Sequence, residues 1–285
     1  MGRFNNLFSG LFGPRRPLAR RGHFPATVSE LVSYGKVNQW HLLSLRALET
    51  LADRMVLAGF SAMQFEYLAA GSMGFYASPK PVIDKFATAW NHVLRPRKLA
   101  ACVTIVNGNV GGGGVAENGG VSICNSQFNN QWFTNLVGSI IGLSGADEGI
   151  WLCPVSELGC RNKDCRAKGR GWVDIGRQLH TGHCLWNGNG DSSPNNALAG
   201  FDREWHCSNV NHISAGAYNV TDHSNVLNQL GGLRNHVQRH DLLAQMVRAC
   251  RVRNAGFGYY QFWSPDGKPD WAAIDTIGAA LKGAS

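Results

Sequence analysis

Three acidic residues of this sequence end short apolar runs, a pattern typical of enzyme sites. They are Glu66, Glu157 and Asp222. Two carboxyl groups flanking a sugar bond suffice for glycoside hydrolysis: one donates a proton to the leaving oxygen, and the other attacks the anomeric carbon or activates water. The pattern predicts Glu157 as the acid and Asp222 as nucleophile or base, with Glu66 as an alternative for either role. The structural alternative is a loop-capping Glu157 and a turn-forming Asp222.

Aromatic and amide side chains lie in or just beyond the same kind of run. The apolar face of a sugar ring stacks on aromatic rings, while its hydroxyl groups bond to amides. The predicted sugar-binding residues are Asn107, Trp186, Asn187, Asn209, Gln261 and Trp263. Each tryptophan taken alone fits a place in the core better, so only the combination favours a sugar site.

Strand-like runs recur along the chain and are separated by helix-sized segments. The runs cover residues 62–66, 101–107, 149–157, 182–187, 204–209, 217–222 and 256–263. Such alternation implies parallel βαβ units, and 285 residues are close to the roughly 250 of a (β/α)8 barrel. The expected fold class is therefore α/β, a TIM-like (β/α)8 barrel with long loops. Its first strand is expected within residues 24–34.

Apolar residues at helical spacing predict the intervening helices. We expect helices over residues 38–59, 81–96, 132–141 and 174–180, and an Ala-rich helix at the end of the chain. Gly59 is the expected C-cap of the first helix. Residues 224–253 have a helical pattern interrupted at Gly231 and Gly232, which predicts two helices there.

The order of these elements resembles the clan of TIM-barrel glycoside hydrolases that carries its acid/base after strand four and its nucleophile after strand seven. The resemblance rests on Glu157, on Asp222 and on the terminal run Tyr-Tyr-Gln-Phe-Trp-Ser at 259–264, and spans most of residues 25–285. It implies an eight-stranded barrel and hydrolysis with retention, with Glu157 as acid/base and Asp222 at the nucleophile position. Ser156 stands where the clan usually has Asn, and Asp222 where it usually has Glu.

Two other function classes stay open. A barrel that has lost catalysis would keep a carbohydrate-binding or structural role. A metal-dependent barrel hydrolase would combine Asp222 with histidines drawn from His180, His183, His206, His212 and His223. A His-x-His pair ending the first strand is missing, however, and the pair His180 and His183 falls at the entrance of the fifth strand. The sequence therefore predicts neither a metal ion nor another cofactor.

The N-terminal segment differs in composition from the rest of the chain. Five arginines precede the first acidic residue, so most of the net charge of +8 belongs to this segment. We expect a basic, aromatic arm over residues 1–24 and a single barrel domain over 25–285. The arm is either a flexible surface segment or an anchor on a partner protein, an anionic membrane or nucleic acid. The mildly basic body predicts no specific nucleic-acid binding.

An arm joined to a barrel is similar to glycosidase-like proteins attached to bacteriophage tails and related particles. This resemblance implies a virion-associated protein whose arm docks on an assembly while the barrel binds or cuts surface polysaccharide. No apolar stretch reaches 18 residues, and the run before Pro14 is short and interrupted. The sequence therefore predicts neither a transmembrane segment nor a secretory signal.

Seven of the eight cysteines fall into two groups. Those within strand-like runs or on a helical stripe are expected as buried free thiols: Cys102, Cys153, Cys184, Cys207 and Cys250. Cys160 and Cys165 flank a polar loop, where either a local disulfide or two free thiols fits.

Overall fold

The fold is built on one parallel sheet of eight strands. The computed structural model describes residues 21–36, 40, 43–65, 80–107, 129–143, 149–156, 163–180, 183, 186–187, 204–209, 226–232, 240–252, 254–261 and 268–283. The strands are β1 (Val32–Lys36), β2 (Ala62–Phe65), β3 (Ala100–Asn107), β4 (Ile150–Ser156), β5 (Trp186–Asn187), β6 (Glu204–Asn209), β7 (Val226–Gly232) and β8 (Gly256–Gln261). Their order in the sheet is β4-β3-β2-β1-β8-β7-β6-β5.

This strand order is the one expected of a sheet that winds once around a cylinder. The first and last strands pair in the middle of the sheet, from Val32 opposite Phe257 to Lys36 opposite Gln261. The two edge strands are linked by a backbone hydrogen bond of 2.8 Å, in which the amide of Leu152 in β4 donates to the carbonyl of His183, just ahead of β5. A (β/α)8 barrel requires both features.

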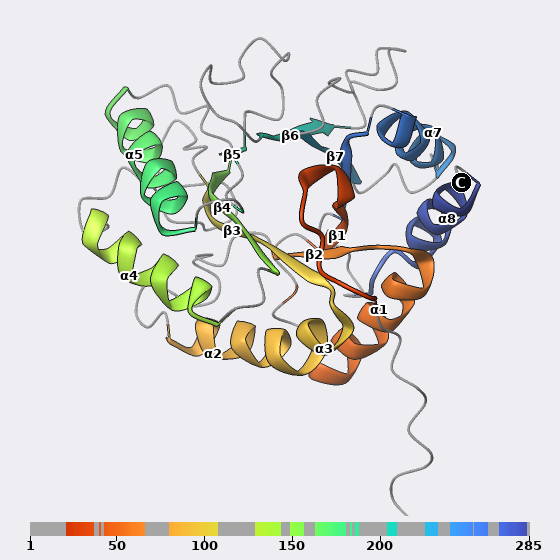
Figure 1. The fold of residues 1–285 in the computed structure, drawn as a ribbon, viewed down its shortest axis with the longest axis horizontal. Helices are drawn as coiled ribbons and strands as arrows, with labels where there is room; N and C mark the ends of the chain where they lie inside the picture. The colour runs from red at the N-terminus through yellow and green to blue at the C-terminus, as the bar shows by residue number, and fades with distance from the viewer. Residues whose placement is uncertain are drawn as a thin grey trace, which may run out of the picture.

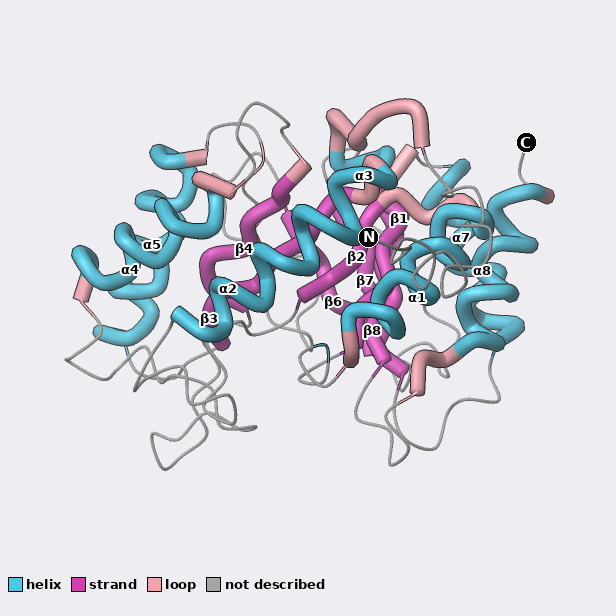
Figure 2. The backbone as a smooth tube through the Cα atoms, turned by 90° about the horizontal axis from the view of Figure 1, so that it is seen from below, coloured by secondary structure: helices cyan, strands magenta, loops and turns pink. Residues whose placement is uncertain are grey.

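Helices lie outside the strands (Figure 1), and the side view shows them along the sheet (Figure 2). They are the 3-10 turn η1 (Val28–Glu30), α1 (Leu45–Ala58), α2 (Lys80–Ala89), the π-turn η4 (Trp90–Leu94), α3 (Arg95–Arg97), α4 (Asn130–Ile141), α5 (Lys163–Leu179), α7 (His240–Val252) and α8 (Trp271–Lys282). None of these described helices has the length and apolar composition needed to span a membrane.

Local sequence signals explain where α1 begins and ends. The Ser44 side chain accepts a hydrogen bond from the amide of Ala47 at 3.2 Å, so the helix begins later than residue 38. Gly59 ends it with φ of 93°, a left-handed conformation that favours glycine, as the sequence predicted. Leu48, Ala52 and Met55 form the expected buried stripe, whereas Leu45 is exposed.

Most of the predicted strands are confirmed, but the first lies later than expected. The runs at 62–66, 101–107, 149–157, 182–187, 204–209 and 256–263 contain most or all of β2, β3, β4, β5, β6 and β8. Residues 28–30 form a 3-10 turn because the Glu30 carboxylate accepts from the amides of Ala26 and Thr27 at 2.6 and 3.2 Å. The strand therefore starts at Val32.

The prediction for the seventh strand was wrong. The strand between β6 and β8 is Val226–Gly232, a stretch for which a helix was expected, and residues 217–222 lie outside the described residues. A short run of Val, Leu, Asn and Gln fits the period of a helix as well as that of a strand. Pairing with β6 on one side and β8 on the other makes this run a strand. Asp222 therefore precedes the seventh strand in the chain instead of following it.

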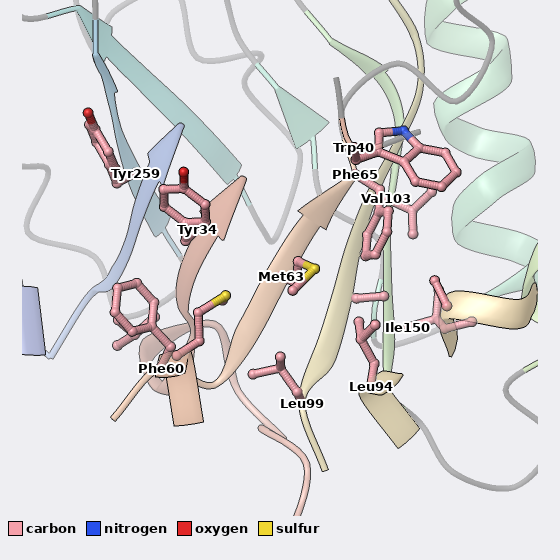
Figure 3. Close-up of a cluster of buried hydrophobic side chains, with 14 of the residues drawn as sticks. Tyr34, Trp40, Phe60, Met63, Phe65, Leu94, Leu99, Val103, Ile150 and Tyr259 are labelled. Carbon is pink, nitrogen blue, oxygen red and sulfur yellow. The ribbon is translucent and has the colours of Figure 1, made fainter. Parts of the chain in front are cut away.

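Alternate residues of the strands pack on opposite faces of the sheet. Met63, Phe65 and Val103 belong to the large core that includes helix side chains, and Figure 3 shows Phe65 and Val103 beside Trp40. The other face carries small side chains around one large ring, in a cluster of Val28, Leu31, Ala62, Ala100, Cys102, Trp151 and Cys153. Cys102, Cys153 and Cys250 are buried and form no disulfide, as predicted.

The end of the predicted arm is attached beside the amino-terminal ends of β2 and β3. The backbone amide of Arg21 donates to the carbonyl of Arg97 at 2.9 Å, and its guanidinium donates to the carbonyl of Phe60 at 3.1 Å. Phe24 stacks on Trp90 with ring centroids 5.6 Å apart. Residues 1–20 lie outside the described residues.

Two glycines give a matched test of how closely α1 and α8 pack. A Cβ atom at Gly278 would lie 2.8 Å from the Cβ of Ala58, whereas one at Gly138 in α4 would meet nothing within 4 Å. We expect Gly278→Ala to lower the free energy of unfolding by about 1–3 kcal/mol, and Gly138→Ala to raise it by about 0.5–1 kcal/mol. Urea unfolding measures both, and a stabilised Gly278→Ala variant would contradict the close packing.

Candidate active site

The parallel direction of the strands puts all their carboxyl ends at one edge of the sheet. Glu66 follows Phe65, the last residue of β2, and Glu157 follows Ser156, the last residue of β4. In parallel barrels this edge is where catalytic residues gather. Glu66, Glu157, Asp222 and Trp263 themselves lie outside the described residues.

Strand register fixes how far apart the ends of β2 and β4 are. Phe65 pairs with Val103, whereas Ser156 pairs with Asn107, four residues further along β3. At roughly 3.3 Å per residue and 4.8 Å per strand, the two ends differ by about 13 Å along the strands and about 10 Å across them. Residues that follow these ends must turn towards each other before their side chains can meet.

Most of the predicted sugar-binding residues occupy strand ends. Asn107, Asn187 and Asn209 are the last residues of β3, β5 and β6, and Trp186 begins β5. In register, Asn107 lies opposite Ser156. Asn107, Asn187 and Asn209 therefore lie at the carboxyl ends of their strands, and contact of any of these residues with sugar stays a prediction.

Gln261, the sixth predicted binding residue, ties the end of β8 to the start of α8. Its Oε1 accepts from the Tyr34 hydroxyl at 2.5 Å and from the Asp270 amide at 2.9 Å. Its Nε2 donates to the carbonyl of Lys268 at 3.1 Å. The side chain therefore holds the segment that returns from the loop after β8, and its role as a sugar ligand stays a prediction.

Two buried tyrosines complete this network. The Tyr259 hydroxyl donates to Asp270 Oδ2 at 3.0 Å, and the Asp270 amide donates to the Tyr34 hydroxyl, also at 3.0 Å. Figure 3 shows both hydroxyl groups pointing the same way. The other carboxylate oxygen of Asp270 caps α8 by accepting from the amide of Ala273.

Burial changes the acidity of both tyrosine hydroxyls. Desolvation raises the pKa of Tyr34 well above its ordinary value. It also raises the pKa of Tyr259, and the negative charge of Asp270 raises it further. Sequence reasoning missed Tyr34 and Asp270, although an Asp directly before an Ala-rich helix is a recognisable N-cap signal.

Polar side chains line part of the face of the sheet that carries the small residues. Gln64 Nε2 donates to Ser33 Oγ at 2.6 Å, and Gly35 leaves room for it, since a Cβ there would lie 2.4 Å from the Cβ of Gln64. Thr104 lies two residues after Cys102 in β3 and therefore on the same face of the sheet. Among the described residues, its buried Oγ1 has no hydrogen-bond partner. This hydroxyl is available to a water molecule or a ligand.

Two of the histidines considered for a metal site, His180 and His183, lie away from the carboxyl edge, whereas His212 and His223 lie outside the described residues. The His180 ring contacts the carbonyl of Ile150, the first residue of β4, and His183 packs edge-on against Trp151 at 4.4 Å. The prediction that this pair lies at the entrance of the fifth strand is confirmed. His206 lies within β6, and the described part of the chain brings no three potential ligands from His, Cys, Asp and Glu together.

No protein-family model and no curated protein sequence matches the chain. Among solved structures it is similar to a tri-modular GH5 (subfamily 4) endo-β-1,4-glucanase from Bacillus licheniformis, with TM-score 0.59 and 10% identity over 90% of this chain and 60% of that one. It is also similar to Thermotoga maritima Cel5A in complex with cellobiose, with TM-score 0.51 and 13% identity over 91% and 99% of the two chains.

The chain spans 60% of the length of the Bacillus enzyme. Identities of 10% and 13% show a shared fold alone, because one fold can carry unrelated activities. The chain has the α/β fold, with a parallel sheet, of these TIM-barrel glycoside hydrolases.

The tyrosine network predicts how stability depends on alkaline pH. The folded protein keeps the Tyr259 proton at a pH where the unfolded chain, with its ordinary pKa of 10.0, has lost it. The contribution of the Tyr259 hydroxyl to the free energy of unfolding is therefore fully present below about pH 10 and is lost as pH rises further. Tyr259→Phe should cost about 1 kcal/mol at neutral pH and flatten the alkaline fall.

Urea unfolding of the wild type and Tyr259→Phe, at a series of pH values from neutral to about pH 11, measures this difference. We expect the gap in stability between the two proteins to narrow above the ordinary pKa of tyrosine. An unchanged gap across the series would contradict a buried, protonated Tyr259.

Proposed function

We propose that the protein is a glycoside hydrolase-like (β/α)8 barrel, closed between β4 and β5, which takes a carbohydrate chain at the carboxyl edge of its strands. The parallel strand order and the bond from Leu152 to His183 support closure. The shared fold with an endo-β-1,4-glucanase and with a protein in complex with cellobiose supports the class of function by analogy.

The observation that carries the proposal is the place of Glu157 in the chain. It directly follows Ser156, where β4 ends, which is the acid/base position that the clan resemblance implies. In this role the group would hold a proton and donate it to the leaving oxygen.

The second carboxylate comes from a different place than the resemblance implied. Residues 233–239, which connect β7 to α7, contain no Asp or Glu. We therefore assign the second role to Glu66, after β2, or to Asp222, in the connection between β6 and β7. The stagger between the ends of β2 and β4 favours the wider carboxyl spacing of inverting enzymes, about 6.5–9.5 Å, over the 5–5.5 Å of retaining ones.

A β-1,4-linked glucan is the first substrate to test. The similar Bacillus protein is an endo-β-1,4-glucanase, and the Thermotoga protein is in complex with cellobiose. In this chain, Trp186 and Trp263 would stack on sugar rings, while Asn107, Asn187 and Asn209 would bond to hydroxyl groups. Glycan stacking needs no charge, and the low charged content of 16% is compatible with it.

A barrel that binds carbohydrate without cleaving it is the second candidate. The acid-free connection at 233–239, which instead carries Arg234 and Arg239, favours it. Under either candidate we propose that the arm docks the protein on an assembly such as a virus particle. Its root at Arg21 and Phe24 is attached beside the amino-terminal ends of the strands, so a partner held there leaves the carboxyl edge open.

Substitution of Glu157 tests the hydrolase directly. Glu157→Gln should lower the release of reducing sugar from a β-1,4-glucan by about 10²–10⁴-fold, the usual contribution of a general acid. Glu49→Gln in α1 is the matched control and should leave the rate unchanged, because Glu49 lies in a helix away from the edge. Glu66→Gln and Asp222→Asn identify the second carboxylate, and NMR of the released anomer tests inversion.

The same proteins separate the two candidates. A wild type that binds the glucan in a calorimetric titration yet releases no sugar would replace the hydrolase with the binding barrel. Absence of both binding and release across a panel of polysaccharides would contradict the proposal as a whole.

A further inference from the structure

A concave surface lies where helices α7 and α8 end. It is a pocket of ≈ 480 Å³, lined by Ser29, Arg248, Arg251, Val252, Asn254, Ala255 and Gly283. Ser29 precedes β1, and Asn254 precedes β8. In a parallel sheet, residues ahead of the strands lie at the amino-terminal edge, so this pocket is on the opposite side from the proposed active site. Figure 1 shows α7 and α8 side by side.

The pocket carries positive charge that the described residues do not neutralise. Arg248 and Arg251 are three residues apart on α7, and both are exposed. Neither forms a salt bridge with any described acidic residue. Two like charges at this spacing repel each other on a helix, and a bound anion would relieve that repulsion.

The nearest acidic residue in the chain is committed elsewhere. Glu30, next to Ser29, accepts hydrogen bonds from the amides of Ala26 and Thr27. Burial lowers the pKa of Arg21, and the negative charge of Glu30 offsets part of that shift. Glu30 is therefore occupied with the root of the arm, and no acidic side chain from the described ranges lines the pocket.

The rest of the lining suits an anionic group carried on a small carbon skeleton. Ser29 supplies a hydroxyl group and Asn254 an amide, and both can donate to oxygen atoms. Val252, with 86% of its surface exposed, offers an apolar contact. The volume is within the roughly 300–1,000 Å³ of small-molecule sites and exceeds what a bare oxyanion needs.

We propose that this pocket binds a phosphate or sulfate ester on a group of about monosaccharide size. The two guanidinium groups hold the ester oxygens, because their planar donor pairs match phosphate geometry. Ser29 and Asn254 bond to the remaining oxygens, and the carbon skeleton rests on Val252. This site is independent of the proposed function, since it shares no residue with the carboxyl edge.

Calorimetric titration at constant ionic strength tests the pocket, with glucose 6-phosphate, inorganic phosphate and glucose as probes. We expect glucose 6-phosphate to bind at one site, inorganic phosphate more weakly, and glucose not at all. Arg248→Gln and Arg251→Gln should each weaken glucose 6-phosphate binding by about ten- to a hundredfold, as expected for loss of a charged hydrogen bond.

Arg170→Gln is the matched control, because Arg170 is an exposed arginine on a different helix, α5. Its affinity for glucose 6-phosphate should equal that of the wild type. Equal weakening in all three variants would show that the effect is one of general charge. Equal affinity of the wild type for inorganic phosphate and for glucose 6-phosphate would show that the carbon skeleton plays no role. Either result, or no binding by the wild type, overturns the proposal. Sugar release by Arg248→Gln should match the wild type, which keeps this test separate from that of Glu157.

Discussion

The pairing of the first strand with the last is the constraint on which the rest of the structure depends. Five register pairs join β1 to β8, and this brings residues more than 200 positions apart into one hydrogen-bond network. With β1 and β8 adjacent, the remaining strands can only extend in two directions, towards β4 and towards β5. All neighbouring strands pair in parallel. One edge of the sheet therefore collects all the residues that follow a strand.

The two edges of the sheet are consequently different in character. At the amino-terminal edge, chain segments are fastened by specific bonds, such as those from Arg21 to Phe60 and Arg97. Arg97 is itself buried and pairs with Asp53 at 2.8 Å. At the carboxyl edge, five of the eight described strands end in Asn, Gln or Ser, and a glutamate directly follows β2 and β4 in the chain. The network of Tyr34, Gln261 and Asp270 fastens this edge only at the end of β8.

Local sequence signals predicted the elements that local physics decides. Gly59 as a C-cap and the helix within residues 81–96, which buries Val82 and Phe86, follow from short-range spacing, and both are confirmed. Helix α5 begins earlier in the chain than expected. Its first turns carry polar residues and no apolar stripe, so the hydrophobic pattern did not reveal them. Strand β7 could not be predicted locally, since its residues become a strand only by pairing with β6 and β8.

The candidate site divides along the same line. The positions of Asn107 and Asn209 at strand ends follow from the alternation of apolar runs and could be predicted. The network of Tyr34, Gln261 and Asp270 could not, because its bonds join residues 227 and 236 positions apart. The absence of an acid from the connection at 233–239 became visible only when β7 was placed.

A crystal structure of Glu157→Gln with cellotetraose tests the central claim most directly. We expect a sugar chain across the carboxyl edge of the strands, with the side-chain amide introduced at position 157 within about 3 Å of a glycosidic oxygen. A sugar bound at another surface, or a side chain at position 157 directed away from the bound chain, would contradict it.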